Sequence, residues 1–194
     1  MLEQTIAQRP WTVVATSGAA ALVAFTAWCI QDYRAYLALG PGGPPYNFIQ
    51  NLFHNAARQH PSILEIKKSL YERHHDALFV AHDLIESQPE SLPKTAVIAR
   101  GELGHAHPDL SVHLYLSPAD ARVVIEKGWA ERHRLSVPES SWVKNKYAIA
   151  STYVMFYGPR NEKEMEVLRV ILESSIRFMT GRDRVETVQW REAV

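Results

Sequence analysis

The sequence predicts an α+β protein in which one membrane-spanning helix precedes a small domain with a mainly antiparallel sheet and packed helices. Three observations support this: a charge-free apolar run, two alternating segments that can form a hairpin, and two capped amphipathic helices after them. The chain has 194 residues, 46% of them hydrophobic, which suffices for one domain with its own core. Its formal net charge is zero and no basic stretch alternates with aromatic residues, so no nucleic-acid partner is expected.

Residues 11–30 read WTVVATSGAAALVAFTAWCI and contain no charged side chain. At about 1.5 Å per residue, a helix of this length would cross the roughly 30 Å hydrocarbon layer of a membrane. A cleaved signal peptide and a buried helix of a soluble protein are the alternatives. The run is longer than the apolar part of a typical signal peptide, and no clear cleavage site precedes Asp32. We therefore expect a single-pass anchor in the lipid bilayer.

The rest of the chain contains no Asn-x-Ser/Thr acceptor for glycosylation, which fits a domain that faces the cytosol. The expected location of the anchor is an endomembrane. A glycine- and proline-rich stretch, LGPGGPPYNF at residues 39–48, can form neither a helix nor a central strand. The expected organisation is an anchor, a junction, an α+β domain and a polar C-terminal tail, at residues 1–34, 35–60, 61–181 and 182–194.

The first part of the domain is expected to be helical. Pro61 can occupy the first position of a helix, and Ile63, Ile66 and Leu70 recur at helical spacing. This helix, or a pair of helices, would continue through the segment DALFVAHDLIES. Pro89 would end it, since the residue before a proline disfavours the helical conformation.

Two alternating segments follow, TAVIARGELGHAH and LSVHLYL, and predict a β-hairpin that turns at residues 108–110. With this three-residue loop His105 faces His113 across the strands, and His107 lies on the same face. Grouped imidazoles can act as general acids or bases near neutral pH, or they can bind Zn²⁺ or Fe²⁺. A solvated hairpin face is the remaining interpretation. The same register puts Glu102 on the opposite face, so it is not expected to be a ligand.

The last part of the domain contains two capped helices with a strand between them. Ser117 can cap a helix that ends at Gly128, and a strand is expected at about 152–157. Asn161 can cap a long amphipathic helix that runs to Thr180. The apolar stripe of this helix consists of Met165, Leu168, Leu172, Ile176 and Met179.

The sequence GWAERH at residues 128–133 directly follows the first capped helix. Arg132 and His133 can bind an anionic or enolic ligand, because a guanidinium donates a planar fork of hydrogen bonds. Trp129 is either a wall of that site or a plug of the core, and Arg132 could instead form a surface ion pair. The helix before this segment is about 15 Å long and would return it towards the hairpin, so we expect one pocket.

Three stretches of the sequence resemble the fungal luciferase family. They are GELGHAHPDLSVHLYLSPADARVVIEKGWAERH at residues 101–133, YVMFYGPRNEKEMEVLRVILESSIRFMTG at 153–181 and, more loosely, DYRAYLALGPGGPPYNF at 32–48. Luminous members of this family oxidise 3-hydroxyhispidin with O₂ and release CO₂ and light. The resemblance implies an oxygenase without a bound organic cofactor that acts on an enolisable pyrone or phenolic small molecule, with O₂ as its co-substrate. No residue is assigned as a metal ligand. This sequence is shorter than those enzymes between the anchor and the first histidine.

The resemblance also suggests roles for individual residues. One of the histidines would remove the enol proton, Arg132 would hold the enolate oxygen, and Trp129 and Tyr115 would exclude water. The expected catalytic residues are His105, His107, His113, His133 and Arg132, and the expected substrate-binding residues are Trp129, Tyr115 and Arg160. A metal enzyme that uses the histidine face and a non-catalytic binding module of the same fold are the competing hypotheses.

Overall fold

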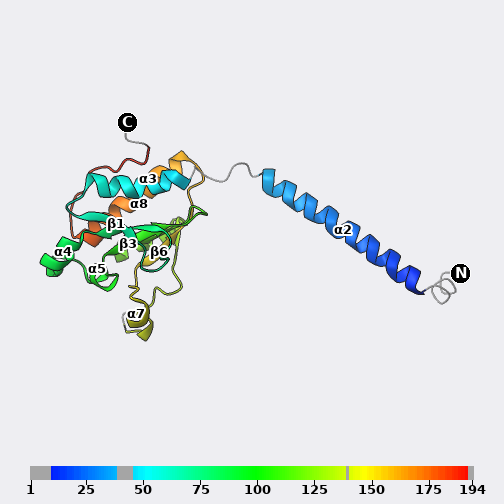
Figure 1. The fold of residues 1–194 in the computed structure, drawn as a ribbon, viewed down its shortest axis with the longest axis horizontal. Coiled ribbons are helices and arrows are strands. Elements are labelled where there is room, and N and C mark those ends of the chain that lie inside the picture. The colour runs from blue at the N-terminus through cyan, green and yellow to red at the C-terminus, as the bar shows by residue number, and fades with distance from the viewer. Residues whose placement is uncertain (1–9, 39–45, 139, 192–194) are drawn as a thin grey trace. The chain divides into compact units, whose positions relative to one another are not determined.

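The structure is a computed structural model that describes residues 10–38, 46–138 and 140–191 (Figure 1). The chain divides into two compact units, Met1–Gly42 and Gly43–Val194. The second unit includes more of the chain than the predicted domain, which was expected at residues 61–181. The residues of the predicted junction at 39–45 lie outside the described ranges.

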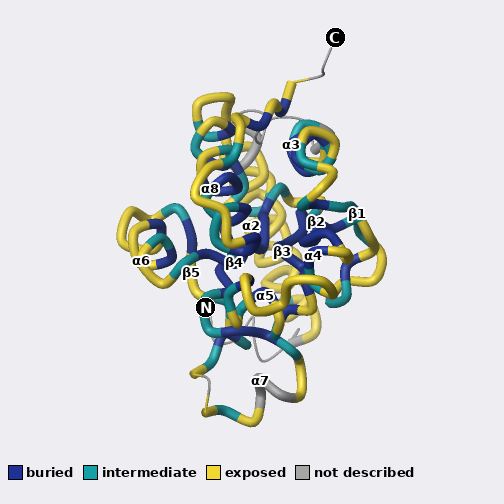
Figure 2. The backbone as a smooth tube through the Cα atoms, turned by 90° about the vertical axis from the view of Figure 1, so that its left-hand side faces the viewer, coloured by how far each residue is buried: buried dark blue, intermediate teal, exposed yellow. Residues whose placement is uncertain are grey.

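In its described part, the first unit is one long helix, α2 (Pro10–Ala38). Its stretch Trp11–Ala35 is long enough and apolar enough to cross a membrane, and none of the stretch is buried against protein. Figure 2 views this helix nearly end on and colours its visible turns as exposed, and Trp11 and Trp28 are among its exposed large side chains. The prediction of an apolar N-terminal helix of spanning length is therefore confirmed.

The second unit is built on a six-stranded sheet with the order β1-β2-β3-β4-β6-β5, in which every pair of neighbours is antiparallel. This confirms the predicted α+β domain with an antiparallel sheet. The strands are β1 (Leu64–Lys68), β2 (Asp76–Val80), β3 (Glu102–Ala106), β4 (Val112–Tyr115), β5 (Ala130–Arg132) and β6 (Tyr153–Phe156).

The hairpin of β3 and β4 has the predicted register, with His105 directly opposite His113. Its loop consists of residues 108–110 and is closed by a hydrogen bond of 2.9 Å from the His107 backbone N–H to the Ser111 carbonyl. Because this loop length fixes the pairing, it also fixes which side chains share a face.

A close approach of the two backbones stabilises this register beside the histidine pair. A Cβ atom at Gly104 would lie 1.8 Å from the carbonyl oxygen of His113, a separation that real Cβ atoms do not reach. Only glycine allows the strands to meet at this point.

Helices cover one face of the sheet. The helix α3 (Tyr46–Gln59) contacts β1 and β2, and α8 (Glu162–Thr180) contacts β3 and β4. Figure 1 shows α3 and α8 on the same side of the sheet and α7 (Trp142–Tyr147) on the other. The remaining helical segments lie in connections or beside β5: α4 (His82–Ser87), η1 (Pro89–Ser91), α5 (Lys94–Ile98) and α6 (Pro118–Glu126).

The two predicted capped helices are present. The Ser117 side chain accepts a hydrogen bond from the Asp120 backbone at the start of α6, and Asn161 does the same for Glu164 in α8. Gly181 ends α8 in the left-handed conformation, with φ 66°. Five residues of the predicted apolar stripe are fully buried: Met165, Leu168, Leu172, Ile176 and Met179.

The expected helix after Pro61 is wrong. Residues 64–80 form the hairpin of β1 and β2 instead, and only α4 is helical in the segment that was predicted to follow. Three apolar residues at helical spacing are a short pattern, and Leu64 and Ile66 also alternate as a strand requires. The run Asp76–Val80 is a mostly buried inner strand, whose continuous apolar sequence does not distinguish a strand from a helix.

The domain also contains segments that were predicted to lie outside it. In α3 the buried residues Ile49, Leu52, Phe53 and Ala56 follow the helical pattern within the predicted junction. Trp190 in the predicted tail is buried as well and donates a hydrogen bond of 2.7 Å from Nε1 to Glu166.

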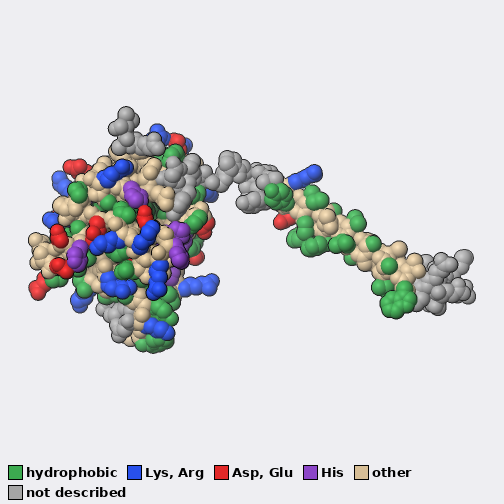
Figure 3. Space-filling model, viewed as in Figure 1, with side chains coloured by type: hydrophobic (Ala, Val, Ile, Leu, Met, Phe, Trp, Pro, Cys, Tyr) green, Lys and Arg blue, Asp and Glu red, His purple; other side chains and the backbone are tan. Residues whose placement is uncertain are grey.

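Charged side chains of both signs are mixed over the visible surface of the domain (Figure 3). In α2, by contrast, Figure 3 shows mainly hydrophobic and uncharged atoms along the described helix.

Candidate functional site

The face of the sheet opposite α8 carries polar aromatic side chains. His113 and Tyr115 of β4 alternate with the core residues Val112 and Leu114, and Tyr153 of β6 lies opposite Tyr115. All of them are buried although no long helix within the described residues of this unit covers this face. The side chains therefore need cover from loops.

Two loops provide this cover. Tyr71, in the loop between β1 and β2, shares a hydrogen bond of 3.0 Å with the Tyr115 hydroxyl and donates one of 2.8 Å to the Ala148 carbonyl. Between these loops and the sheet lies a cavity of about 430 Å³. Its lining residues are Leu70, Tyr71, Glu72, Arg73, Arg100, His105, His113, His133, Leu135, Lys146, Tyr147, Ile149 and Tyr153.

The four predicted histidines form one contiguous cluster at this cavity. The ring centroids of His105 and His113 are 5.3 Å apart, and that of His107 is 5.1 Å from the first and 4.7 Å from the second. His133 joins from beyond β5, with its centroid 4.8 Å from that of His113. We call His105, His107, His113 and His133 the histidine cluster.

His105 is fixed by Glu102. Its Nδ1 lies 2.9 Å from a Glu102 carboxylate oxygen, and both side chains are almost completely buried. The carboxylate also accepts hydrogen bonds from the Ser69 hydroxyl at 2.8 Å and from the Leu70 backbone N–H at 2.7 Å. An ionised carboxylate can only accept, so in the neutral ring of His105 the proton lies on Nδ1 and Nε2 has a lone pair.

Ser111 likewise fixes the proton of the neutral His107 ring on Nδ1. The Ser111 hydroxyl donates to Asp109 at 2.7 Å, so its oxygen accepts from Nδ1 of His107, 3.2 Å away. The Nε2 atom of His107 is buried and has no hydrogen-bond partner, and the same holds for Nε2 of His105 and Nδ1 of His113. Three ring nitrogens of the cluster therefore lack partners.

His133 has the opposite arrangement. Its Nδ1 accepts a hydrogen bond of 3.1 Å from the Leu135 backbone N–H, so in the neutral ring Nε2 carries the proton and is a donor. His133 is half-buried and also packs against Tyr153, with ring centroids 5.1 Å apart. It can donate to an oxygen atom of a bound molecule.

Burial keeps His113 uncharged. Desolvation, reinforced by the neighbouring imidazoles, lowers the pKa of His113 from its ordinary value to about 3. The pKa values of His107 and His133 are lowered too, again mainly by burial. At neutral pH these rings are therefore neutral and able to act as bases or ligands.

Tyr153 adds a donor with no partner in the protein. Its hydroxyl is buried and makes no hydrogen bond, while its ring stacks on His113 with a centroid distance of 5.1 Å. Burial raises the pKa of Tyr153 well above its ordinary value, so the hydroxyl stays protonated.

Cationic side chains also line the cavity. Arg73, Arg100 and Lys146 are exposed and would attract an anionic ligand. Arg73 and Arg100 have left-handed backbones, with φ 60° and 53° respectively, a conformation that side-chain-bearing residues rarely adopt and that concentrates at functional sites. Neither arginine was predicted, because nothing in their spacing along the sequence links them to the histidines.

The expected position of Glu102 is wrong. Between β2 and β3 the pairing shifts at Leu78 and Phe79, so that Phe79 pairs with Glu102 and Leu78 with Gly104. The β-bulge inserts one residue, Leu103, and turns Glu102 to the side of His105. Strict alternation cannot reveal an inserted residue, which is why the prediction failed.

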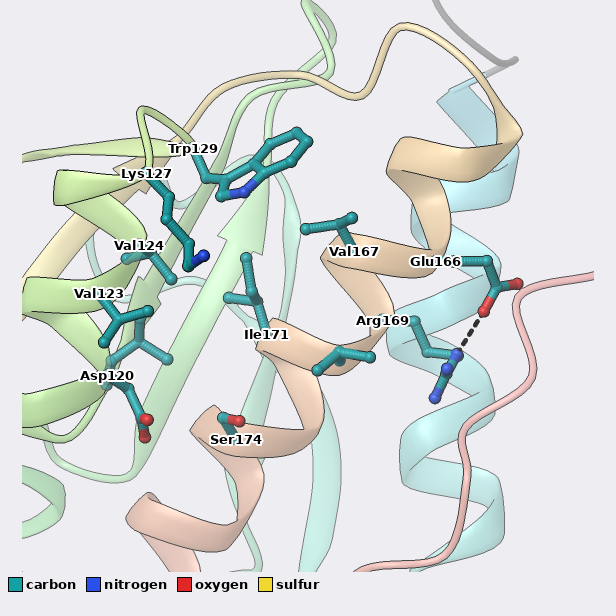
Figure 4. Close-up of a pocket in the computed structure, with 12 residues that line it drawn as sticks. Asp120, Val123, Val124, Lys127, Trp129, Glu166, Val167, Arg169, Ile171 and Ser174 are labelled. Carbon is teal, nitrogen blue, oxygen red and sulfur yellow. Dashed lines mark hydrogen bonds and ion pairs between the residues drawn. The ribbon is translucent and has the colours of Figure 1, made fainter.

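Two predicted site residues lie away from the cluster. Arg132 lines a groove with α6, together with Arg122 and Thr152, because alternation along β5 separates it from His133. Trp129 lies in an apolar cavity between α6 and α8 (Figure 4), where Figure 4 shows it facing Val167. The expectation that these two residues line one pocket with the histidines is therefore wrong.

The contacts of Tyr115 and Arg160 explain both residues as parts of the fold. Tyr115 is fully buried beneath Tyr153, with ring centroids 4.4 Å apart, and is not part of the cavity lining. Arg160 is exposed and ion-pairs with Glu164 at 2.5 Å at the start of α8. That pair explains Arg160 without a ligand.

Comparison with known proteins relates the chain to luciferases. The family model described as Luciferase domain matches residues 100–175, which contain the whole histidine cluster. The chain is 30% identical over 134 residues to the luciferase of Armillaria mellea, covering 67% of this chain and 48% of that protein. It is 31% identical to the luciferase of Neonothopanus nambi over 120 residues, 60% of this chain and 43% of the relative.

The chain spans about half the length of the curated relatives that it matches. No solved structure matches the chain.

Proposed function

Because this chain belongs to the fungal luciferase family, we propose that its domain catalyses the O₂-dependent oxidation of a planar, enolisable pyrone or phenol such as 3-hydroxyhispidin. The reaction would be an oxidative decarboxylation in the cavity at the histidine cluster. Light emission would accompany it if the excited product is shielded from water.

One observation carries the proposal: a single cavity gathers partnerless imidazole nitrogens, a partnerless tyrosine hydroxyl and cationic side chains. An enolate transfers an electron to O₂ far more readily than an enol does, so a site for this chemistry must favour ionisation of its substrate. Imidazole lone pairs can remove the proton or hold a cation, and either action favours the enolate.

The donors would act on the other side of the substrate. The Tyr153 hydroxyl and Nε2 of His133 can donate to the enolate oxygen, as groups that are already oriented and poorly solvated. Arg73, Arg100 and Lys146 at the cavity would balance the negative charge. Arg132 has no part in this proposal, because it lines a different groove.

The electrons of the reaction balance without a further reductant. The enol proton leaves and the enolate carbon forms a bond to O₂, which two electrons of the substrate reduce to a peroxide. The peroxide then adds to the pyrone carbonyl carbon, and its O–O bond breaks together with the carbon–carbon bond that releases CO₂. This cleavage takes two further electrons, which also come from the substrate. A volume of about 430 Å³ lies within the range of about 300–1,000 Å³ that is usual for small-molecule sites.

We also propose that α2 anchors the domain to an endomembrane as a single span, with the domain in the cytosol. The helix is apolar, of spanning length and without protein contacts that would bury it. Residues 11–30 should therefore keep the full chain in the membrane pellet after extraction with alkaline carbonate. Release into the supernatant would contradict the anchor.

The test of the reaction is turnover of 3-hydroxyhispidin by the full chain in membranes, followed by O₂ uptake, CO₂ release and photon counting. O₂ uptake and CO₂ release in equal amounts would support an oxygenase, with or without light. Saturable binding of the substrate without O₂ uptake would support the competing function, a non-catalytic binding module, and would contradict the proposal.

A further inference from the structure

We propose that His105, His107 and His113 bind a divalent first-row transition-metal ion, with Glu72 as a fourth ligand. This inference goes beyond the proposed reaction and does not depend on the substrate. It also departs from the expected site, in which no residue was assigned as a metal ligand. It rests on the positions of the free nitrogens of the three rings and of the carboxylate oxygen of Glu72.

Three ring nitrogens of the cluster are free to bind an ion. Nε2 of His105, Nε2 of His107 and Nδ1 of His113 are all buried and all without a hydrogen-bond partner. Each of the three residues offers a ring nitrogen that lies within 4.8 Å of those offered by the other two. Nitrogens bound to one ion at about 2.1 Å would be about 3.0 to 3.4 Å apart, so modest ring rotations would close the site.

Hydrogen bonds determine which nitrogen of each ring carries the proton. Glu102 fixes the proton of His105 on Nδ1, and the Ser111 hydroxyl does so for His107, which turns both Nε2 lone pairs inward. For His113, the ring interacts with the Val154 backbone, while Nδ1 is the atom without a partner. The atoms that converge are therefore acceptors, and acceptors alone cannot satisfy one another.

The carboxylate of Glu72 faces two of these free nitrogens. One of its oxygens lies 3.6 Å from Nε2 of His107 and 3.9 Å from Nε2 of His105, too far for hydrogen bonds. An anion that faces two lone pairs is repelled unless a cation lies between them. A metal ion at this point would convert the repulsion into coordination, and the side chain of Glu72 is half exposed.

Hydrogen bonds on the far side of the rings orient the candidate ligands. Histidines that bind metals commonly donate their other ring N–H to a carboxylate, hydroxyl or carbonyl, which orients the ring. Glu102 has this position behind His105 and is itself held by Ser69 and Leu70. A set of nitrogens with one carboxylate suits Fe²⁺, Mn²⁺, Co²⁺ or Zn²⁺, and the adjoining cavity leaves coordination positions open.

The test is metal binding by the full chain in detergent, purified through a tag without histidine, stripped with a chelator and titrated with Co²⁺ without oxygen. We expect one Co²⁺ per chain, with visible absorption bands typical of nitrogen ligands. His113→Gln and His107→Gln should each weaken binding by at least about 100-fold. His82→Gln is the matched control, since His82 is an exposed histidine on α4, and it should bind as the unmodified chain does.

Glu102→Gln tests the support behind the ligand. It keeps the size of the side chain but weakens its hold on the His105 proton, and should lower Co²⁺ affinity by about 10–100-fold. Glu72→Gln should change the absorption bands if Glu72 coordinates. Circular dichroism establishes that each variant is folded.

Two outcomes would overturn the proposal: no stoichiometric uptake by the unmodified chain, or equal uptake by that chain and by folded His113→Gln. An extra proton shared between Glu72 and one imidazole, the other way to relieve the repulsion, predicts the first of these outcomes. Because binding is measured without substrate, its failure is distinct from a failure of the oxidation assay.

Discussion

The two faces of the central sheet are both buried, but by different means. On one face α3 and α8 pack apolar side chains against the strands, and the buried stripe of α8 includes Leu172. On the other face loops cover His105, His113 and Tyr153, and the cavity that remains is lined by polar and charged groups. The first face contributes to stability through burial of apolar area. The second face contains buried nitrogen and oxygen atoms without partners, which cost stability and point to a ligand.

The apolar stripe of α8 and the histidine face also differ in how far their parts lie from one another in the sequence. The apolar stripe of α8 lies within one helix. The histidine face combines β3, β4, the loop that contains Tyr71 and the segment near Ala148, connected by hydrogen bonds between distant residues. Five variants, with His82→Ala as a control, test whether the faces divide stability and activity in this way.

The largest effect is expected for His113→Ala. If the histidine cluster ionises the substrate, directly or through an ion, turnover of 3-hydroxyhispidin should fall by about 10²–10⁴-fold. His82→Ala changes an exposed histidine and should leave turnover unchanged. Equal turnover in both folded variants would show that the histidine face is structural and would remove the distinction between the faces.

Leu172→Ala tests the apolar face. Leu172 is fully buried in α8, so truncation should lower the free energy of unfolding by about 2–5 kcal/mol, through lost burial and the cavity left behind. Denaturant unfolding of the full chain in detergent measures this. Turnover per folded molecule should stay within about twofold. A loss of turnover comparable to that of His113→Ala would mean that the two faces are coupled.

Arg100→Ala and Arg132→Ala form a pair that differs only in position. Arg100 lines the histidine cavity, so its removal should raise KM for an anionic substrate by about tenfold, or about 1.4 kcal/mol. Arg132 lines the groove beside α6, and its removal should change KM by less than about twofold. The reverse order would mean that substrate binds on the α6 side of the sheet.

Tyr153→Phe should have the smallest effect on stability. The hydroxyl of Tyr153 has no partner, so its removal should change the free energy of unfolding by less than about 1 kcal/mol. If the hydroxyl donates to the enolate, turnover should still fall several-fold. A clear loss of stability would indicate that an ordered water molecule or a protein group holds the hydroxyl in the free protein.

Sequence patterns predicted the parts of the fold that depend on local regularity. The cap at Asn161, the buried stripe of α8 and the register of His105 with His113 all follow from spacing within one or two neighbouring elements. Patterns failed where the structure depends on distant contacts or on an irregularity. The strand β1 is too short to distinguish from a helix, and the β-bulge at Leu103 reverses the face of Glu102.

The same contrast holds within the candidate site. His133 reaches His113 because both lie on one face across β6, which the order of the strands decides. Arg132, its neighbour in sequence, faces the other way for the same reason. The positions of Arg73 and Arg100 follow from loops that only the folded chain brings together.

Gly104 has a consequence for the evolution of this hairpin. Since any side chain at that position would collide with the backbone of His113, a relative that carries another residue there must have separated the two strands or shifted their pairing. Either change would move His105 away from His113. The residue at this position should therefore distinguish, among divergent luciferase-like sequences, those that still assemble the histidine cluster from those that have lost it.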